Sequence, residues 1–181
     1  MPTMNEVACR CGKVRLRLEG APLLAVECQC DSCRKAAVRL EAISGKSPAT
    51  ADTGGTPFVL YRKDRVSLAS ARELHSHRLT ATSKTRRVVA ACCGTPLFLE
   101  FQGGHWLSLY AGLWSAESRP APVMRTMVSD VPAGQTMPTD IPNHKTQSAG
   151  FFFTLLTAWA AMGFRSPAIA VAGESVWGDG P

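Results

Sequence analysis

The chain has 181 residues, 45% of them hydrophobic and 19% charged, which fits a folded domain with a sizeable core and excludes wholesale disorder. Its net charge of +6 favours an acidic partner, such as nucleic acid, an anionic membrane or an acidic metabolite, or else indicates only a basic surface. The seven cysteines are an odd number, which argues against a complete set of intrachain disulfides. Because the N-terminus shows no secretory-signal pattern, we expect a reducing, cytoplasmic environment, where clustered thiols commonly bind metal or take part in catalysis.

The first part of the chain is predicted to form short strands. We expect residues 1–7 to be a loose lead-in. The alternation of apolar and charged residues from Lys13 to Glu19 predicts a strand with one buried face. A second strand is expected at 23–27, a short helix at 33–40 and a mobile loop, rich in Gly, Ser, Thr and Pro, at 44–57.

Six further strands are expected downstream. They span 58–62, 66–69, 73–80, 86–91, 97–101 and 106–110, with a hairpin turn at 102–105 between the last two. Short strands separated by turn signals predict a mainly antiparallel β domain over residues 5–114.

The C-terminal third changes character. Five prolines interrupt residues 115–150, so we expect an extended arm there. The apolar run from Phe151 to Phe164, ended by Arg165, predicts a helix over 151–165 that is too short for a confident membrane span. A helix that is apolar on all sides must be buried, either on the β domain or on a second subunit, which would give a homodimer. Membrane association is the less favoured alternative, and the remaining residues are expected to be a tail.

Three cysteines, Cys28, Cys30 and Cys33, lie within six residues at C-x-C-x-x-C spacing. This spacing lets one tight turn direct three sulfurs at one point, about 2.3 Å from a zinc ion. A structural zinc almost always has four protein ligands, whereas a catalytic zinc keeps one position free. The trio therefore predicts an open zinc site, unless a fourth protein ligand closes it.

The other four cysteines are Cys9 and Cys11 near the start and Cys92 and Cys93 far downstream. A glycine follows Cys11 and Cys93, and glycine permits the positive φ that turns backbone N–H groups toward sulfur. Together the four thiols predict a closed structural zinc that joins distant parts of the β domain. Adjacent cysteines rarely both reach one metal without strain, so Cys92, Cys93 or both are left as candidates.

These motifs, C-x-C-G at 9–12, C-x-C-x-x-C-R at 28–34 and C-G-T-P-L-F at 93–98, resemble the glutathione-dependent formaldehyde-activating enzyme family, which also includes centromere protein V. The resemblance implies two packed β sheets, a four-cysteine structural zinc and a three-cysteine zinc whose free position takes a thiol. It also implies carbon–sulfur lyase chemistry, the condensation of formaldehyde with glutathione to S-hydroxymethylglutathione. The chain departs from the family pattern at Ala90, usually cysteine, and at Gln29, often histidine.

From these residues we predict a zinc enzyme acting on a glutathione-like thiol or its aldehyde adduct. Its site residues would be the trio and Arg34, which could pair with a substrate carboxylate. The alternatives are a non-enzymatic zinc-stabilised binding module for protein or nucleic acid, and a redox protein with a Cys30–Cys33 disulfide.

The histidines and the basic residues are assigned lesser roles. His75 and His77 would share one face of a strand, in a core or surface role, and His105 is expected to be a polar turn residue. The basic residues at 62–87 are weak evidence for nucleic-acid binding because no aromatic residues interleave them.

Overall fold

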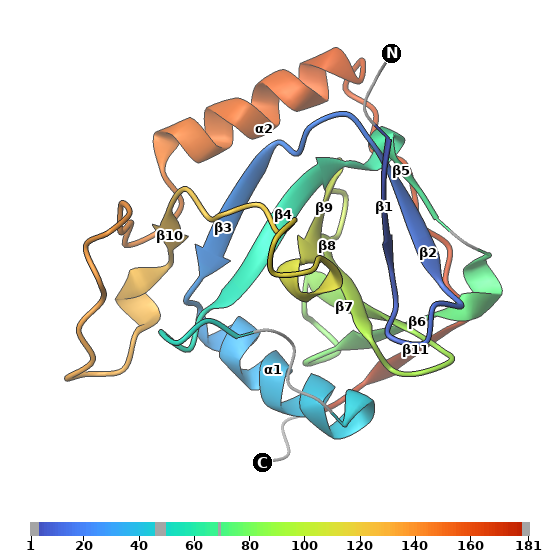
Figure 1. Ribbon diagram of the computed structural model, residues 1–181, viewed down its shortest axis with the longest axis horizontal. Helices are drawn as coiled ribbons and strands as arrows, with labels where there is room; N and C mark the ends of the chain where they lie inside the picture. The colour runs from blue at the N-terminus through green and yellow to red at the C-terminus, as the bar shows by residue number, and fades with distance from the viewer. Residues whose placement is uncertain (1–3, 46–49, 69, 179–181) are drawn as a thin grey trace.

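The computed structural model describes residues 4–45, 50–68 and 70–178 and contains two β sheets and two α-helices in these ranges (Figure 1). The small sheet has the order β1-β2-β5, with strands at Met4–Ala8, Arg15–Glu19 and Val66–Ser67. The large sheet has the order β10-β3-β4-β9-β8-β7-β6-β11. In that order its strands span Arg125–Thr126, Leu24–Cys28, Thr56–Arg62, Trp106–Tyr110, Pro96–Phe101, Thr85–Ala90, Leu74–Arg78 and Gly173–Val176. The predicted mainly β fold with two packed sheets and a C-terminal helix is confirmed.

The large sheet is buried on both faces, and strand β4 shows the division. Alternate side chains of a strand point to opposite faces. Val59 and Tyr61 share one core with the small sheet, whereas Phe58 and Leu60 share a second core with the two helices. This double burial explains why β4 is an almost continuous apolar run rather than an alternating one.

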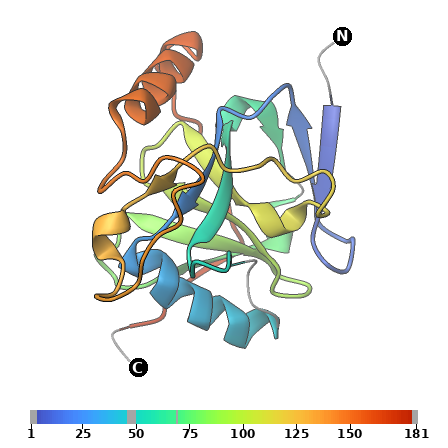
Figure 2. The ribbon, with the colours of Figure 1, turned by 60° about the vertical axis from the view of Figure 1, so that its left-hand side comes forward.

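The two helices lie at opposite ends of the large sheet, as Figure 2 shows. Helix α1 spans Asp31–Ser44, so it begins two residues before the predicted helix and ends four residues after it. Gly45 ends it in the left-handed conformation, with φ 64° and its N–H bonded to Glu41 O. Residues 50–55 of the expected loop precede β4, and 46–49 lie outside the described residues.

The expectations for both ends of the chain were wrong. Residues 4–8, expected to be a lead-in, form β1 and pair antiparallel with β2, and Val7 is buried. The expected tail contains β11, which pairs parallel with β6. A second parallel pair joins β10 in the arm to β3, so the large sheet is mixed. Residues 1–3 of the expected lead-in, residue 69 of the expected strand 66–69 and residues 179–181 of the expected tail lie outside the described part of the chain.

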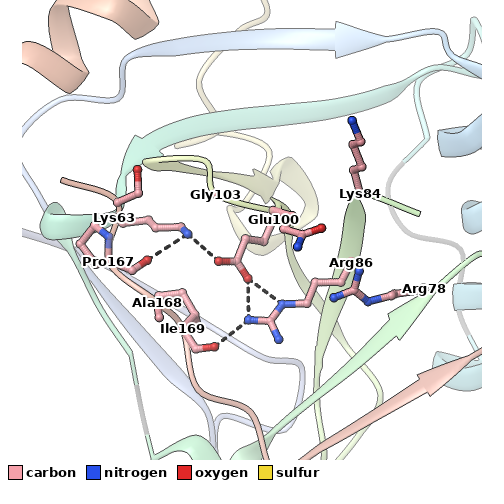
Figure 3. A pocket seen from close by; sticks show the side chains of 11 residues that line it. Lys63, Arg78, Lys84, Arg86, Glu100, Gly103, Pro167, Ala168 and Ile169 are labelled. Atoms are coloured by element: carbon pink, nitrogen blue, oxygen red, sulfur yellow. Dashed lines mark hydrogen bonds and ion pairs between the residues drawn. The ribbon is translucent and has the colours of Figure 1, made fainter. Parts of the chain in front are cut away.

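A buried ion network holds the segment before β11 against the large sheet (Figure 3). Lys63 Nζ lies 2.5 Å from Glu100 Oε1 and donates to Pro167 O at 3.0 Å. Arg86 donates to Glu100 Oε2 at 2.6 Å and to Ile169 O at 2.6 Å. The side chains of Lys63 and Glu100 are only 2% and 8% exposed, so removing either charge would leave the other buried with less compensation and would destabilise the fold.

Other basic residues of the 62–87 region are also paired within the chain. Arg62 pairs with Asp64, Arg65 with Glu19 and Arg78 with Glu174. Each of these three arginines therefore has an acidic partner within the chain.

Helix α2, Ala149–Ala161, packs on the β domain through one face only. Phe151, Leu155 and Ala158 are buried, while Phe152, Phe153 and Leu156 are 54–67% exposed. The composition of the helix suggested burial on all sides, but one face is exposed. A second subunit on this outer face stays a prediction. In the described part of the chain, no helix is long and apolar enough to cross a membrane.

His105 lies beneath α2 and is buried, which corrects its expected role as a simple polar turn residue. Its ring stacks on Trp159 with centroids 5.6 Å apart and planes 9° apart. Burial lowers the pKa of His105, and the charge of Lys63 lowers it further.

This burial predicts a loss of stability in mild acid. Since the pKa of His105 is lower in the folded state than in the unfolded state, the unfolded state binds more protons in mild acid, and the free energy of unfolding falls as the pH drops below about 6.5. Urea unfolding between pH 7.5 and 5 measures the slope. We expect His105→Phe to reduce it, leaving the part due to His77, whose pKa is also lowered by burial. An unchanged slope in His105→Phe would contradict the assignment.

Two candidate metal centres

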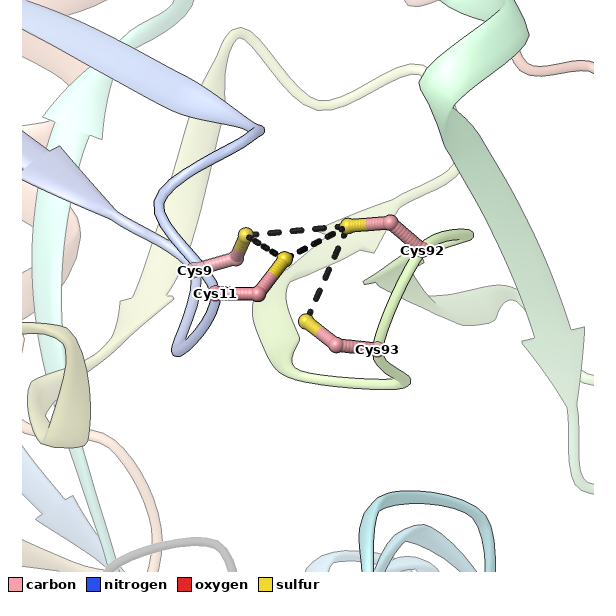
Figure 4. Close-up of side chains that lie close together, drawn as sticks. All are labelled: Cys9, Cys11, Cys92 and Cys93. Carbon is pink, nitrogen blue, oxygen red and sulfur yellow. Dashed lines mark hydrogen bonds between the residues drawn. The ribbon is translucent and has the colours of Figure 1, made fainter.

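The first cluster contains Cys9 and Cys11 from the β1–β2 turn and Cys92 and Cys93 from the turn after β7 (Figure 4). All four Sγ atoms lie within 4.8 Å of one another. The Sγ–Sγ distances are 3.5 Å for Cys9–Cys11, 3.7 Å for Cys9–Cys92, 3.3 Å for Cys11–Cys92 and 3.7 Å for Cys92–Cys93. The structure thus brings both members of the adjacent pair to the cluster.

This arrangement fits a zinc ion. Four sulfurs about 2.3 Å from a tetrahedral centre are about 3.8 Å apart, slightly more than the distances seen here. Gly12 and Gly94 have φ of 75° and 67°, as predicted, and the Val14 N–H donates to Cys9 Sγ at 3.3 Å. At Gly94 an added Cβ would lie 2.8 Å from Ile43 O, so only glycine fits between the cluster and the end of α1.

The second cluster is the trio at the C-terminal end of β3. Cys28 ends the strand, Cys30 is the N-cap of α1 and Cys33 lies in its first turn. Their Sγ atoms lie within 4.8 Å of one another, with Cys28 and Cys30 3.4 Å apart. In the described ranges this group has no fourth Cys, His, Asp or Glu ligand. The donor set fits a zinc site with one position left open.

Contacts within the trio favour ionisation of Cys30. Hydrogen bonds from Cys28 and then Cys33 hold the pKa of Cys30 below its usual value, and the Ser32 hydroxyl, 3.1 Å from Cys30 Sγ, acts in the same direction. Contact with Cys30 raises the pKa of Cys28, and contacts with Cys28 and Cys30 raise the pKa of Cys33. The positive end of the α1 dipole lies at the trio and stabilises thiolates, the form of cysteine that binds a metal ion.

Arg34 is held by the protein itself. Its guanidinium donates to Gln29 O, to Asp130 O and to Asp31 Oδ1, the last at 2.6 Å. These contacts fix the start of α1 against residues 128–130 of the arm. They favour a positioning role, and the pairing of Arg34 with a substrate carboxylate stays a prediction.

Arg87 was missed by the sequence analysis. It is fully buried in β7, and its Nη2 donates to Ser32 O while Nη1 donates to Thr85 Oγ1, both at 3.2 Å. No carboxylate in the described part of the chain forms an ion pair with it. A buried cation is stabilised by negative charge nearby, and the Ser32 carbonyl that Arg87 contacts lies between Cys30 and Cys33 of the trio. Arg87 lies two residues before Val89 and so on the face of β7 that meets the helix-side core, but the sequence alone does not mark that face as buried.

His75 and His77 share one face of β6, as predicted, with ring centroids 4.9 Å apart. His77 stacks on Trp177 at a centroid distance of 4.9 Å, and its Nδ1 lies 2.7 Å from Ser175 Oγ. Both candidate metal groups in the described residues consist of cysteines alone. The contacts of His77 with Ser175 and Trp177 instead support a role in packing the C-terminal segment on β6.

Comparison with known proteins places these features in a family. A solved structure of a Rhodobacter sphaeroides protein has a TM-score of 0.42 and 14% sequence identity, covering 77% of this chain and 99% of that chain. The comparison with curated proteins gave no match. The model of the glutathione-dependent formaldehyde-activating enzyme family matches residues 4–130, which include both cysteine clusters. The chain therefore belongs to the glutathione-dependent formaldehyde-activating enzyme family.

Proposed function

We propose that the protein is a carbon–sulfur lyase that joins a thiol to an aldehyde, and separates the adduct again, at the three-cysteine site. The observation that carries this proposal is the convergence of three thiols that lack a fourth ligand from the described residues. A large cleft adjoins the trio, so a substrate can reach it. Family membership supports the same chemistry.

The residues divide into two roles. Cys9, Cys11, Cys92 and Cys93 would hold a structural zinc, and the trio would hold the second ion. When bound at the trio, zinc offers a free position to a thiol and lowers its pKa, which makes the thiolate available near neutral pH.

The reaction needs a carbonyl group beside the thiol. The thiol gives its proton to water, its sulfur forms a bond to the carbonyl carbon, and the C=O electron pair moves to oxygen, which takes up a proton from water in return. Ser108 and Thr126 place hydroxyl groups on the cleft wall, where they can donate a hydrogen bond to that oxygen. Arg87, which donates to Ser32 O between Cys30 and Cys33, would balance the negative charge of the trio. Cleavage of the adduct follows the same path in reverse.

The Cys30→Ser substitution tests this function. We expect about two zinc ions per chain in the unaltered protein and about one in the variant, since one of the two clusters loses a ligand. We also expect Cys30→Ser to lose thiol binding, measured by calorimetry with glutathione, and adduct formation, measured by NMR. Circular dichroism should show an unchanged fold. Thiol binding that survives in the metal-depleted trio would refute the proposal.

The alternative is a non-enzymatic zinc-stabilised module that binds another protein. The observation that favours it is the exposed apolar face of α2, formed by Phe152, Phe153 and Leu156. The same surface would serve a homodimer. This alternative predicts no thiol binding at the trio, so the titration above separates the two functions.

A further inference from the structure

The cleft beside the trio is large and mostly apolar. Its volume is about 730 Å³, within the range of pockets that hold organic ligands. Cys28, Cys30 and Cys33 form one part of its wall. Much of the rest is aromatic or aliphatic, including Phe58, Leu60, Leu99, Trp106, Phe151 and Leu155.

The charges of the cleft do not suit the two carboxylates of glutathione. Asp31 and Asp130 are the charged lining residues apart from the thiols, and no lysine, arginine or histidine in the described part of the chain lines it. Glutathione carries two carboxylates, which proteins commonly bind with arginine or lysine. Arg34, the cation next to the trio in sequence, already donates to three partners of its own chain.

Helix α2 supplies part of the apolar wall. Phe151, Phe152 and Leu155 line the cleft, and all three lie beyond residues 4–130, the segment that matches the family model. Phe151 and Leu155 are buried in the helix-side core, whereas Phe152 is 58% exposed. The shape of this wall therefore depends on a part of the chain outside the family match.

We propose that the cleft binds an apolar group, aromatic or long aliphatic, carried by the thiol adduct, so that this chain prefers such adducts to S-hydroxymethylglutathione. The inference rests on the proposed function and adds the substrate class to it. The apolar group can enter on the thiol or on the aldehyde. In either case the same carbon–sulfur bond forms, with the proton transfers described above.

A titration of the zinc-loaded full chain tests the thiol side. The probes are benzyl mercaptan, glutathione and 2-mercaptoethanol, and the readouts are calorimetry and the change in tryptophan fluorescence, to which Trp106 in the cleft wall contributes. We expect benzyl mercaptan to bind about tenfold or more tightly than 2-mercaptoethanol, since its ring leaves water for an apolar wall. For the aldehyde side, adduct formation from glutathione is compared by NMR with benzaldehyde and with formaldehyde.

Each outcome has a distinct meaning. Preference for benzyl mercaptan places the apolar group on the thiol, and preference for benzaldehyde places it on the aldehyde. Binding of thiols without either preference overturns this inference and leaves the proposed function standing. Failure of all three thiols to bind overturns the proposed function and this inference with it.

Two neighbouring phenylalanines provide a matched pair of variants. Phe152 lines the cleft and Phe153 does not, although both are on α2 and are 58% and 67% exposed. We expect Phe152→Ser to weaken binding of the favoured aromatic probe about three- to tenfold, with 2-mercaptoethanol unaffected. Phe153→Ser should leave both unchanged, and zinc content should be the same in both variants. Equal effects of the two substitutions would overturn the role of α2.

Discussion

Loss of metal from the four-cysteine cluster is expected to destabilise the whole fold. Binding of structural zinc in small metal sites contributes about 10–16 kcal/mol of apparent free energy, while a domain is typically stable by only about 5–15 kcal/mol. Here the cluster joins the β1–β2 turn to the turn after β7, and the small sheet it anchors includes a β5 of just two residues. We expect Cys11→Ser to cost on the order of 5 kcal/mol, with the largest loss of order in the small sheet.

Urea unfolding and hydrogen exchange measure this effect. The matched control is Cys30→Ser, which makes the same chemical change in the trio and should cost far less stability. Exchange should accelerate first around Val7 and Leu16, which are buried between the sheets. If Cys11→Ser unfolded at the same urea concentration as Cys30→Ser, the closed cluster would have no structural role.

The second large effect is expected at Glu100. Glu100→Gln removes the carboxylate that lies between Lys63 and Arg86 and leaves a lysine that is 2% exposed without its counter-charge. Breaking a buried ion pair by removing one partner costs about 3–5 kcal/mol. We therefore expect a loss of this size in the free energy of unfolding, measured by urea denaturation.

A surface pair supplies the control. Glu6→Gln removes the partner of Arg15, whose side chain is 61% exposed, and such pairs contribute at most about 1 kcal/mol. The double variant Lys63→Met with Glu100→Gln should be more stable than Glu100→Gln alone, because it removes the unpaired charge. A Glu100→Gln protein as stable as Glu6→Gln would show that the network is not needed.

Sequence reasoning found what is encoded locally. Alternation in Lys13–Glu19 predicted β2, and the spacing of Cys28, Cys30 and Cys33 predicted that their sulfurs converge, because both depend on neighbours in the chain. The glycines after Cys11 and Cys93 likewise predicted the positive φ seen in both turns.

The remaining features depend on distant partners. Strands β1 and β11 are stabilised by pairing with β2 and β6, and neither has the period-two pattern that would mark it. Arg87 and His105 are buried by the elements that pack over them, and their polar side chains gave no sign of it. Helix α2 is apolar on all sides, so its composition could not show which face would meet the sheet.

Strand β11 has a consequence for handling the protein. It covers the backbone hydrogen-bonding edge of β6, and it is itself only four residues long and carries Glu174, which pairs with Arg78. Short, charged outer strands oppose association between molecules. A chain ending before Gly173 would leave the hydrogen-bonding edge of β6 unpaired and open to other copies. We expect such a chain to aggregate while both cysteine clusters still bind metal.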